Sequence, residues 1–169
     1  RSRLIFEAPT RGLIGYQSEL LTVTSGTAVI NRLFSRYESY KGEIKGRTNG
    51  VLISNGNGIS VAFALFNLEE RGQMIIGSGI PVYQGMIIGV HTRPNDLEVN
   101  ILKGKKLTNI RTHSKDEAVK LTPPLAMNLE KAIAWISDDE LIEVTPKSIR
   151  IRKKFLDPNV RKKIARKVS

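Results

Sequence analysis

Residues 3–34 read RLIFEAPTRGLIGYQSELLTVTSGTAVINRLF, and this stretch decides the fold class of the first part of the chain. Arg3–Ala8 is typical of a strand, because its apolar side chains alternate between two faces. A helix is predicted between a capping Thr10 and Gly26, where glycine suits the left-handed conformation that ends a helix. Thr27–Phe34 is a second predicted strand. The result is a βαβ unit with parallel strands, whose partner strands must lie elsewhere.

The rest of the chain predicts a β-rich module with two or three helices, giving an α+β fold class overall. The polar segment Arg36–Arg47 is predicted to be the linker. Helices are predicted at Ile59–Arg71, where a buried strand is the alternative, after a capping Asn128, and after Asp157-Pro158. The predicted strands are Val51–Ser54, Met74–Ile76, Met86–Val90, Leu97–Leu102, Leu141–Val144 and Ser148–Arg152.

The charge of the chain is large and local. Its 169 residues carry 27 Lys and Arg against 16 Asp and Glu, a net charge of +11. Residues 1–100 hold 10 basic and 8 acidic groups (+2), whereas residues 101–169 hold 17 and 8 (+9). Such an excess favours a polyanionic partner, with nucleic acid first and an anionic membrane surface second.

Composition also bounds the compartment. Cysteine is absent, which is compatible with a reducing cytosol and excludes disulfides and thiolate metal sites. No apolar run approaches the roughly 20 residues that a membrane helix needs, so we expect a cytoplasmic protein without membrane contacts. The chain opens directly into strand-like sequence without a methionine, and we interpret it as a piece of a longer protein.

The segment Lys103–Thr122, KGKKLTNIRTHSKDEAVKLT, is the main functional candidate. It is basic, polar and without a sustained apolar period, and such long segments inside a domain are usually functional or disordered. A solvated surface loop is the alternative for any single run of charges. Because the charge excess lies in this part of the chain, we favour a loop that is displayed to RNA.

Nine residues are predicted to contact RNA. The lysines and arginines of the loop would bind phosphate, and its Asn and His would read or stack on exposed bases. Two further arginines follow the loop on a predicted strand whose isoleucines, Ile149 and Ile151, face inward, so that the arginines face outward as a fixed array. The nine are Lys103, Lys105, Lys106, Asn109, Arg111, His113, Lys115, Arg150 and Arg152. The basic stretch Arg161–Lys167 is interpreted as a solubilising tail.

The sequence gives little support for a catalytic site or a metal site. Gly104-Lys105 is the nearest approach to a phosphate-binding Gly-x-x-x-x-Gly-Lys-Ser/Thr motif, but Lys106 follows it, so this chain is not expected to be an enzyme or to hydrolyse GTP. His91 and His113 have no neighbouring ligands, and no metal site is predicted. Asp138-Asp139-Glu140 is interpreted as a solvated acidic helix end.

Several longer sequence motifs carry a resemblance to a known family. Ile14-Gly15-Tyr16 and the pattern that follows it to Tyr40 resemble the second half of the fifth, ferredoxin-like domain of elongation factor G. Later segments resemble the C-terminal domain of the TypA/BipA ribosome-associated GTPases, and the departures lie at Thr112-His113, Leu125-Ala126-Met127 and the last dozen residues. The matching segments include Arg47–Ser54, Lys103–Asn109, Asp116–Val119, Leu121–Pro124 and Glu143–Arg150.

The resemblance implies a domain division and a function. Residues 1–40 would be the second half of the elongation-factor module, and residues 41–169 the family-specific domain. The implied function is ribosome docking near the A site, with contacts to large-subunit rRNA and the tRNA acceptor end. The parent protein would be a monomeric GTPase with roles in ribosome assembly and translation under stress. Its GTP and Mg²⁺ would bind in a nucleotide-binding domain that this chain lacks, so no cofactor is expected here.

Two other classes of function remain open. The chain could be an intramolecular regulator that packs on its own GTPase domain. It could also be a general polyanion-binding or anionic-membrane-binding module that uses the basic C-terminal residues.

Overall fold

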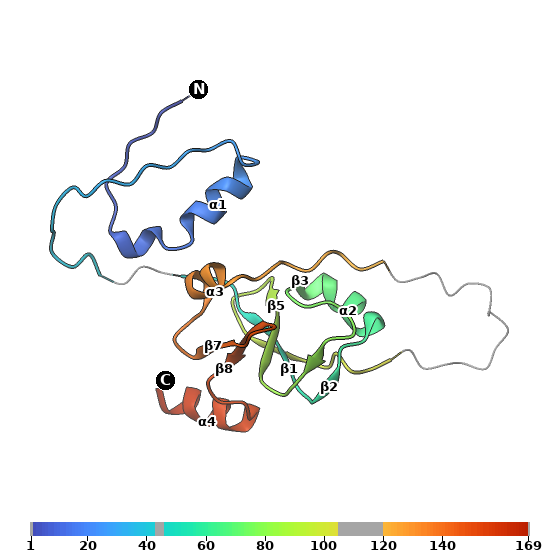
Figure 1. Cartoon of the computed structure of the whole chain (residues 1–169). Coiled ribbons are helices and arrows are strands. Elements are labelled where there is room, and N and C mark those ends of the chain that lie inside the picture. The colour runs from blue at the N-terminus through green and yellow to red at the C-terminus, as the bar shows by residue number, and fades with distance from the viewer. Residues whose placement is uncertain (1, 43–45, 105–119, 169) are drawn as a thin grey trace.

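A six-stranded sheet organises the larger part of the molecule (Figure 1). The computed structural model describes residues 2–42, 46–104 and 120–168. The sheet order is β6-β1-β5-β8-β7, and β3 also pairs with β5; only the β1–β6 ladder is parallel. Its strands are β1 Val51–Ser54, β3 Gly72–Met74, β5 Met86–His91, β6 Leu97–Val99, β7 Glu140–Val144 and β8 Ile149–Lys153. A separate short ladder joins β2 Gly58–Ile59 to β4 Pro81–Val82.

Both faces of the sheet carry an apolar core. Side chains alternate along a strand, so Leu52 joins one cluster, which includes Leu65 of helix α2 (Ala62–Leu68). Val51 and Ile53 join the other, which includes Ala132 of helix α3 (Leu129–Trp135). Because each face has a cover, all four residues of β1 are buried. The fold class is α+β, as predicted.

The predicted elements of this module are largely confirmed. The strand alternative for Ile59–Arg71 is wrong: α2 and a 3₁₀ turn, Glu69–Arg71, occupy most of this range. The helix begins only at Ala62 because Gly58–Ile59 pairs with β4. Asn128 caps α3 as expected, and its Oδ1 accepts a hydrogen bond from the backbone N of Lys131 at 2.8 Å.

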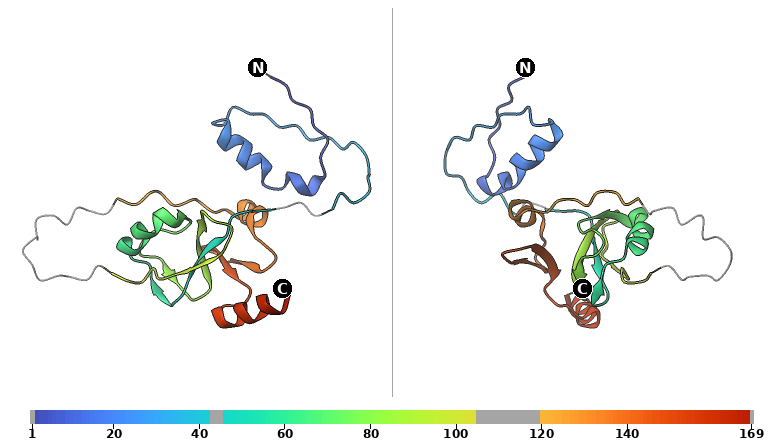
Figure 2. Two further views of the ribbon diagram at one scale, coloured as in Figure 1. Left: turned by 180° about the vertical axis from the view of Figure 1, so that it is seen from behind. Right: turned by 45° about the vertical axis from the view of Figure 1, so that its right-hand side comes forward.

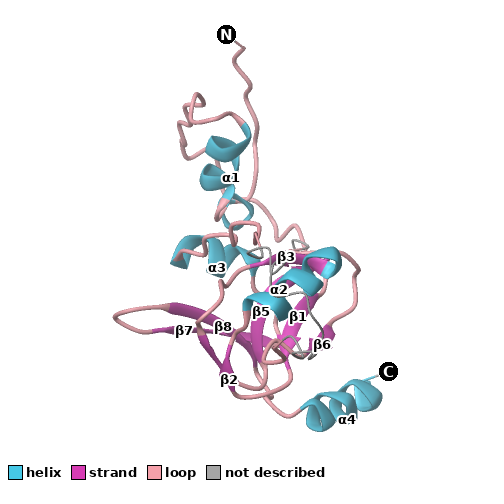
Figure 3. Cartoon of the chain, turned by 90° about the vertical axis from the view of Figure 1, so that its right-hand side faces the viewer, coloured by secondary structure: helices cyan, strands magenta, loops and turns pink. Residues whose placement is uncertain are grey.

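The C-terminal helix α4 spans Pro158–Val168. Asp157 precedes it, and the Asp157 Oδ1 accepts a hydrogen bond from the backbone N of Asn159 at 2.7 Å. This is the capping role that the sequence predicted. Figure 3 shows α4 at the opposite end of the molecule from helix α1 (Tyr16–Val23).

The first module departs from its prediction. A 3₁₀ turn at Thr10–Leu13 and helix α1 (Tyr16–Val23) replace the single predicted helix, with Gly15 at φ +75° between them. Gly26 is left-handed, at φ +79°, as expected. The predicted strands Arg3–Ala8 and Thr27–Phe34 form no ladder among the described residues. A strand needs a hydrogen-bonded neighbour, and the described part of the chain supplies none to either segment.

The first module lies beside α3 (Figure 2). The Ser18 hydroxyl donates to Glu130 Oε2 at 3.3 Å, and a Cβ added at Gly15 would overlap the Cβ of Ala134. The left-handed φ of Gly15 and this close approach both require glycine there.

One prediction concerns a close approach within the sheet. At Gly72, an added Cβ would overlap the backbone carbonyl of Val90 on the paired strand β5. Gly72→Ala should therefore lower the free energy of unfolding by about 1–3 kcal/mol, because backbone must shift to admit the methyl group. Gly77→Ala is the matched control, since an added Cβ there meets nothing within 4 Å. Urea unfolding of both variants measures the difference, and equal stability would contradict the packing argument.

Candidate nucleic-acid interface

The ends of the basic loop are attached to the core. Ile101 is buried, and Leu102 and Leu121 pack against the cluster on the α2 face of the sheet. On the return side, the backbone N of Thr122 donates to Glu69 Oε1 at 2.6 Å. Lys103 is exposed at the outgoing end. The described loop ends are therefore fixed to the side of the molecule that carries α2 (Figure 1).

Most of the predicted contact residues lie outside the part of the chain that the structure describes. Lys103 belongs to the described residues, but six others lie outside them. These six are Lys105, Lys106, Asn109, Arg111, His113 and Lys115. Their role in RNA binding stays a prediction.

The two predicted arginines of β8 are less free than an outward-facing array would be. Ile151 is buried and Ile149 packs partly against the same core, so Arg150 and Arg152 lie on the opposite face as predicted. That face is also partly covered, and both arginines are only partly exposed. They share a neighbourhood with one carboxylate, Glu143, on the paired strand β7.

Glu143 neutralises much of this charge. Its Oε1 accepts a hydrogen bond from Arg152 Nε at 2.7 Å, and its Oε2 accepts one from the Tyr83 hydroxyl at 2.6 Å. Arg152 Nη1 also donates to the backbone oxygen of Lys153 at 3.2 Å. Arg150 lies directly opposite Glu143 in the β7–β8 ladder. Arg152 is thus engaged inside the protein, which leaves Arg150 as the stronger candidate of the two.

The structure does not bring all the predicted residues together. Lys103 follows β6, at one edge of the sheet, whereas Arg150 and Arg152 lie on β8, next to the β7 edge. The loop and the arginines of β8 are therefore separate candidate surfaces.

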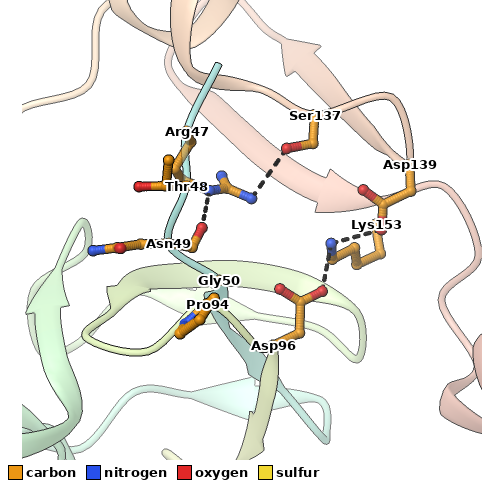
Figure 4. Close-up of a pocket in the computed structure, with 9 residues that line it drawn as sticks. All are labelled: Arg47, Thr48, Asn49, Gly50, Pro94, Asp96, Ser137, Asp139 and Lys153. Carbon is orange, nitrogen blue, oxygen red and sulfur yellow. Dashed lines mark hydrogen bonds and ion pairs between the residues drawn. The ribbon is translucent and has the colours of Figure 1, made fainter. Parts of the chain in front are cut away.

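An ion cluster around a buried lysine is the main feature that was not predicted from the sequence. Lys153 is almost fully buried, and its Nζ lies 2.6 Å from Asp96 Oδ2, 2.7 Å from Asp139 Oδ2 and 3.0 Å from Glu140 Oε1. Figure 4 shows Lys153 pointing toward Asp96 and Asp139 from across the cleft. A buried ammonium needs such partners, because removing an isolated charge from water is very unfavourable.

Arg47 completes the cluster from the linker side. Its guanidinium donates to both oxygens of Glu140, at 2.7 and 3.2 Å, and its central carbon lies 4.0 Å from the ring centre of Trp135. Arg47 Nε also donates to the backbone oxygen of Asn49 at 2.6 Å. Bidentate pairing and stacking on an indole ring suit the planar guanidinium of arginine. The linker is thereby fixed to the turn between α3 and β7.

These residues line an open cleft that is polar but has little free charge (Figure 4). Lys153 and Arg47 supply two positive charges, and Asp96, Asp139 and Glu140 supply three negative ones. A phosphate would have to compete with carboxylates already in contact, so the cleft is a structural centre. Among the described residues, no group of three or more His, Cys, Asp or Glu is arranged to hold a metal ion. The cleft is lined by Arg47, Thr48, Asn49, Gly50, Pro94, Asp96, Ser137, Asp139 and Lys153.

The interpretation of Asp138-Asp139-Glu140 as a solvated acidic helix end is wrong for Glu140. That residue is buried, pairs with Lys153 and Arg47, and accepts a hydrogen bond from the backbone N of Ser137. A signal existed in the sequence: Lys153 has the same strand parity as the inward-facing Ile149 and Ile151. A lysine on the buried side of a strand implies a nearby carboxylate.

In the part of the chain that the structure describes, no helix is long and apolar enough to cross a membrane.

Loss of the buried ammonium should be costly. Lys153→Ala would leave the buried Glu140 with Arg47 as its one cation and the more exposed Asp96 and Asp139 with none, and we expect the free energy of unfolding to fall by about 1–3 kcal/mol. Lys154→Ala, at the exposed neighbouring position, is the control and should change stability by less than about 0.5 kcal/mol. Thermal and urea unfolding would measure both, and a mild effect at Lys153 would show that the cluster contributes little.

Stability should also fall at alkaline pH. Burial opposes the charge of Lys153, but hydrogen bonds to Asp139 and Asp96 outweigh it and raise its pKa above the ordinary 10.5. Burial and the hydrogen bond to Glu143 raise the pKa of Tyr83 above the ordinary 10.0. In both cases the unfolded chain loses its proton first, so the free energy of unfolding should decrease as pH rises above about 10. Urea unfolding at several pH values between about 9 and 11 would measure this change in the free energy of unfolding with pH. The slope should be shallower in Tyr83→Phe, and an identical slope would contradict the assignment.

Comparison with known proteins identifies the family. Residues 49–158 match the model of the TypA/BipA C-terminal domain, and residues 1–48 match that of the elongation factor G C-terminus. Over 167 residues, 98% of the chain, it is 56% identical to proteins named large ribosomal subunit assembly factor BipA from Salmonella typhimurium and Escherichia coli K12. The Haemophilus influenzae relative of the same name is 54% identical over the same length. The chain spans only 27–28% of the length of these relatives. The chain therefore belongs to the TypA/BipA family and corresponds to the C-terminal region of its members.

Proposed function

We propose that this chain is the ribosome-docking region of a translational GTPase. In this proposal it contacts large-subunit rRNA and the acceptor end of tRNA near the A site. Its basic loop inserts among phosphates and unpaired bases, and the sheet acts as the rigid support. The relatives named as large ribosomal subunit assembly factors support a ribosomal partner.

One observation carries the proposal: the charge excess of residues 101–169, +9, includes a basic loop whose described ends are fixed to the core and to the 3₁₀ turn that follows α2. Phosphate contacts by Lys and Arg release counterions, which makes binding strong and dependent on salt. Fixed ends reduce the entropy lost when a loop is ordered on RNA, because its two anchor points need no further positioning.

The activity of the whole protein follows as part of the same proposal. GTP and Mg²⁺ would bind in a domain outside this chain, and hydrolysis there would control when the C-terminal region engages the ribosome. Cytoplasmic localisation and roles in ribosome assembly and in translation under stress belong to that whole protein.

The test is co-sedimentation of the chain with large ribosomal subunits across a salt series. A variant that combines Lys105→Ala, Lys106→Ala and Arg111→Ala should show a less steep dependence of log affinity on log salt. The magnitude of the slope should fall by about two, since each phosphate contact contributes about 0.7–0.9. Circular dichroism should be unchanged, because the sequence predicts no regular secondary structure at the three positions.

The matched control removes three exposed cations from residues 1–41, as Arg3→Ala, Arg36→Ala and Lys41→Ala. It changes the net charge equally and should alter the slope by less than about one. Equal slopes in the two triple variants would remove the loop from the interface. Changed GTP turnover in the full-length protein, with unchanged ribosome affinity, would favour the intramolecular regulator instead.

A further inference from the structure

The C-terminal helix α4 is a fixed element with one strongly basic face. Within Pro158–Val168 the charged residues are all cations: Arg161, Lys162, Lys163, Arg166 and Lys167. Lys162 and Arg166 lie one turn apart, as do Lys163 and Lys167, so these four side chains form two adjacent rows on one side of the helix. All four are exposed.

The fifth cation, Arg161, has a different role. Its guanidinium donates to the backbone oxygens of Phe155 and Leu156, at 2.5 and 2.7 Å, and pairs with Glu98 of β6. It is largely buried, whereas its helical neighbours are not. Arg161 therefore fixes the start of α4 to the edge strand of the sheet, and the helix is not a freely moving tail.

The four exposed cations are not neutralised internally. No ion pair or hydrogen bond joins Lys162, Lys163, Arg166 or Lys167 to another side chain within the described part of the molecule. Like charges at i and i+4 destabilise a helix by a few tenths of a kcal/mol for each pair, and the C-terminal dipole offsets only part of this. An external row of negative charges would remove the repulsion.

The apolar residues of α4 favour RNA over a membrane as the source of those charges. A helix that lies in a bilayer surface buries a wide apolar face with aromatic anchors. The apolar side chains Val160 and Ile164 are about two-thirds covered, at 37% and 36% exposure, and α4 contains no aromatic residue. What α4 offers to a partner is its row of cations.

The attachment of α4 to β6 relates it to the loop. Glu98, which holds Arg161, lies on the strand after which the chain runs directly to Lys103 and the basic loop. The loop therefore leaves the sheet at the strand to which Arg161 fastens α4. From this attachment α4 runs away from the described ends of the loop, so the two basic elements present their charge at different places on the molecule (Figure 1).

We propose that the exposed face of α4, formed by Lys162, Lys163, Arg166 and Lys167, is a second phosphate-binding surface, separate from the basic loop, that docks on ribosomal RNA. This inference rests on the proposed ribosome-docking function and adds to it a defined surface. Lys and Arg along one helix face contact phosphates without reading sequence, so α4 sets orientation and affinity.

The first experiment measures salt dependence on purified large ribosomal subunits. A variant with Lys162, Lys163, Arg166 and Lys167 changed to Gln should lower the slope of log affinity against log salt by about three. The control changes Arg3, Arg36, Lys41 and Lys147, all exposed, to Gln, and should lower it by less than about one. Glutamine keeps helix propensity, and circular dichroism checks the fold of each variant. Equal slopes would overturn the proposal.

The second experiment does not depend on removing charge. The chain has no cysteine, so Asn159→Cys on α4 gives a single attachment site for an iron chelate that generates hydroxyl radicals. We expect cleavage of ribosomal RNA from position 159, at sites that differ from any cleaved from a control chelate at Gln17→Cys, an exposed position of α1 at the opposite end of the molecule from α4. Absence of cleavage from position 159, while the chain remains bound, would also overturn the proposal.

Two outcomes separate this inference from the broader one. If the loop variant loses salt dependence and the α4 variant does not, ribosome docking stands and the α4 surface is wrong. If the unmodified chain fails to bind large subunits, both are wrong. Vesicles containing phosphatidylserine are the final probe. Charge-dependent binding of α4 to them, with unchanged ribosome binding, would assign the helix to a membrane surface and overturn the proposal.

Discussion

The buried ammonium of Lys153 is the constraint on which the larger module depends. A lysine removed from water needs carboxylates in contact, and here they come from Asp96, Asp139 and Glu140. Glu140 in turn binds Arg47 of the linker. Four segments that are far apart in the sequence therefore meet at this cluster: the loop after β5, the turn before β7, strand β8 and the linker.

The same cluster changes how the basic charge of the chain is interpreted. Ten Lys and Arg lie between residues 147 and 167, and as a sum they suggest one large electropositive surface. Lys153 is buried among carboxylates, Arg152 is paired with Glu143, and Arg161 fastens α4 to Glu98. These three side chains form ion pairs inside the protein and stabilise its fold. The cations available to a polyanion are those that the structure leaves exposed, above all on α4 and at Lys103.

The first module shows what a short segment can and cannot specify. Its helix forms beside α3, and Gly15 and Gly26 adopt the left-handed conformations that glycine allows. The two flanking segments have strand-like sequences, yet neither is paired among the described residues, and Phe6 and Leu33 stay exposed. Strand propensity is a preference for a half-buried, hydrogen-bonded surface, and it has no effect without a neighbouring strand.

The sequence by itself determined the fold class, most strands of the larger module, the caps at Asn128 and Asp157, and the family, because these depend on local periodicity, capping chemistry and distinctive words. It also indicated where basic charge is concentrated. Only the tertiary structure decided which cations are consumed internally. Whether Lys153 is solvated or buried depends on Asp96 and Glu140, which β-sheet pairing and the turn before β7 bring to it from elsewhere in the chain. The residues fix the charge of the chain, whereas tertiary packing decides which charged side chains stay exposed to a partner.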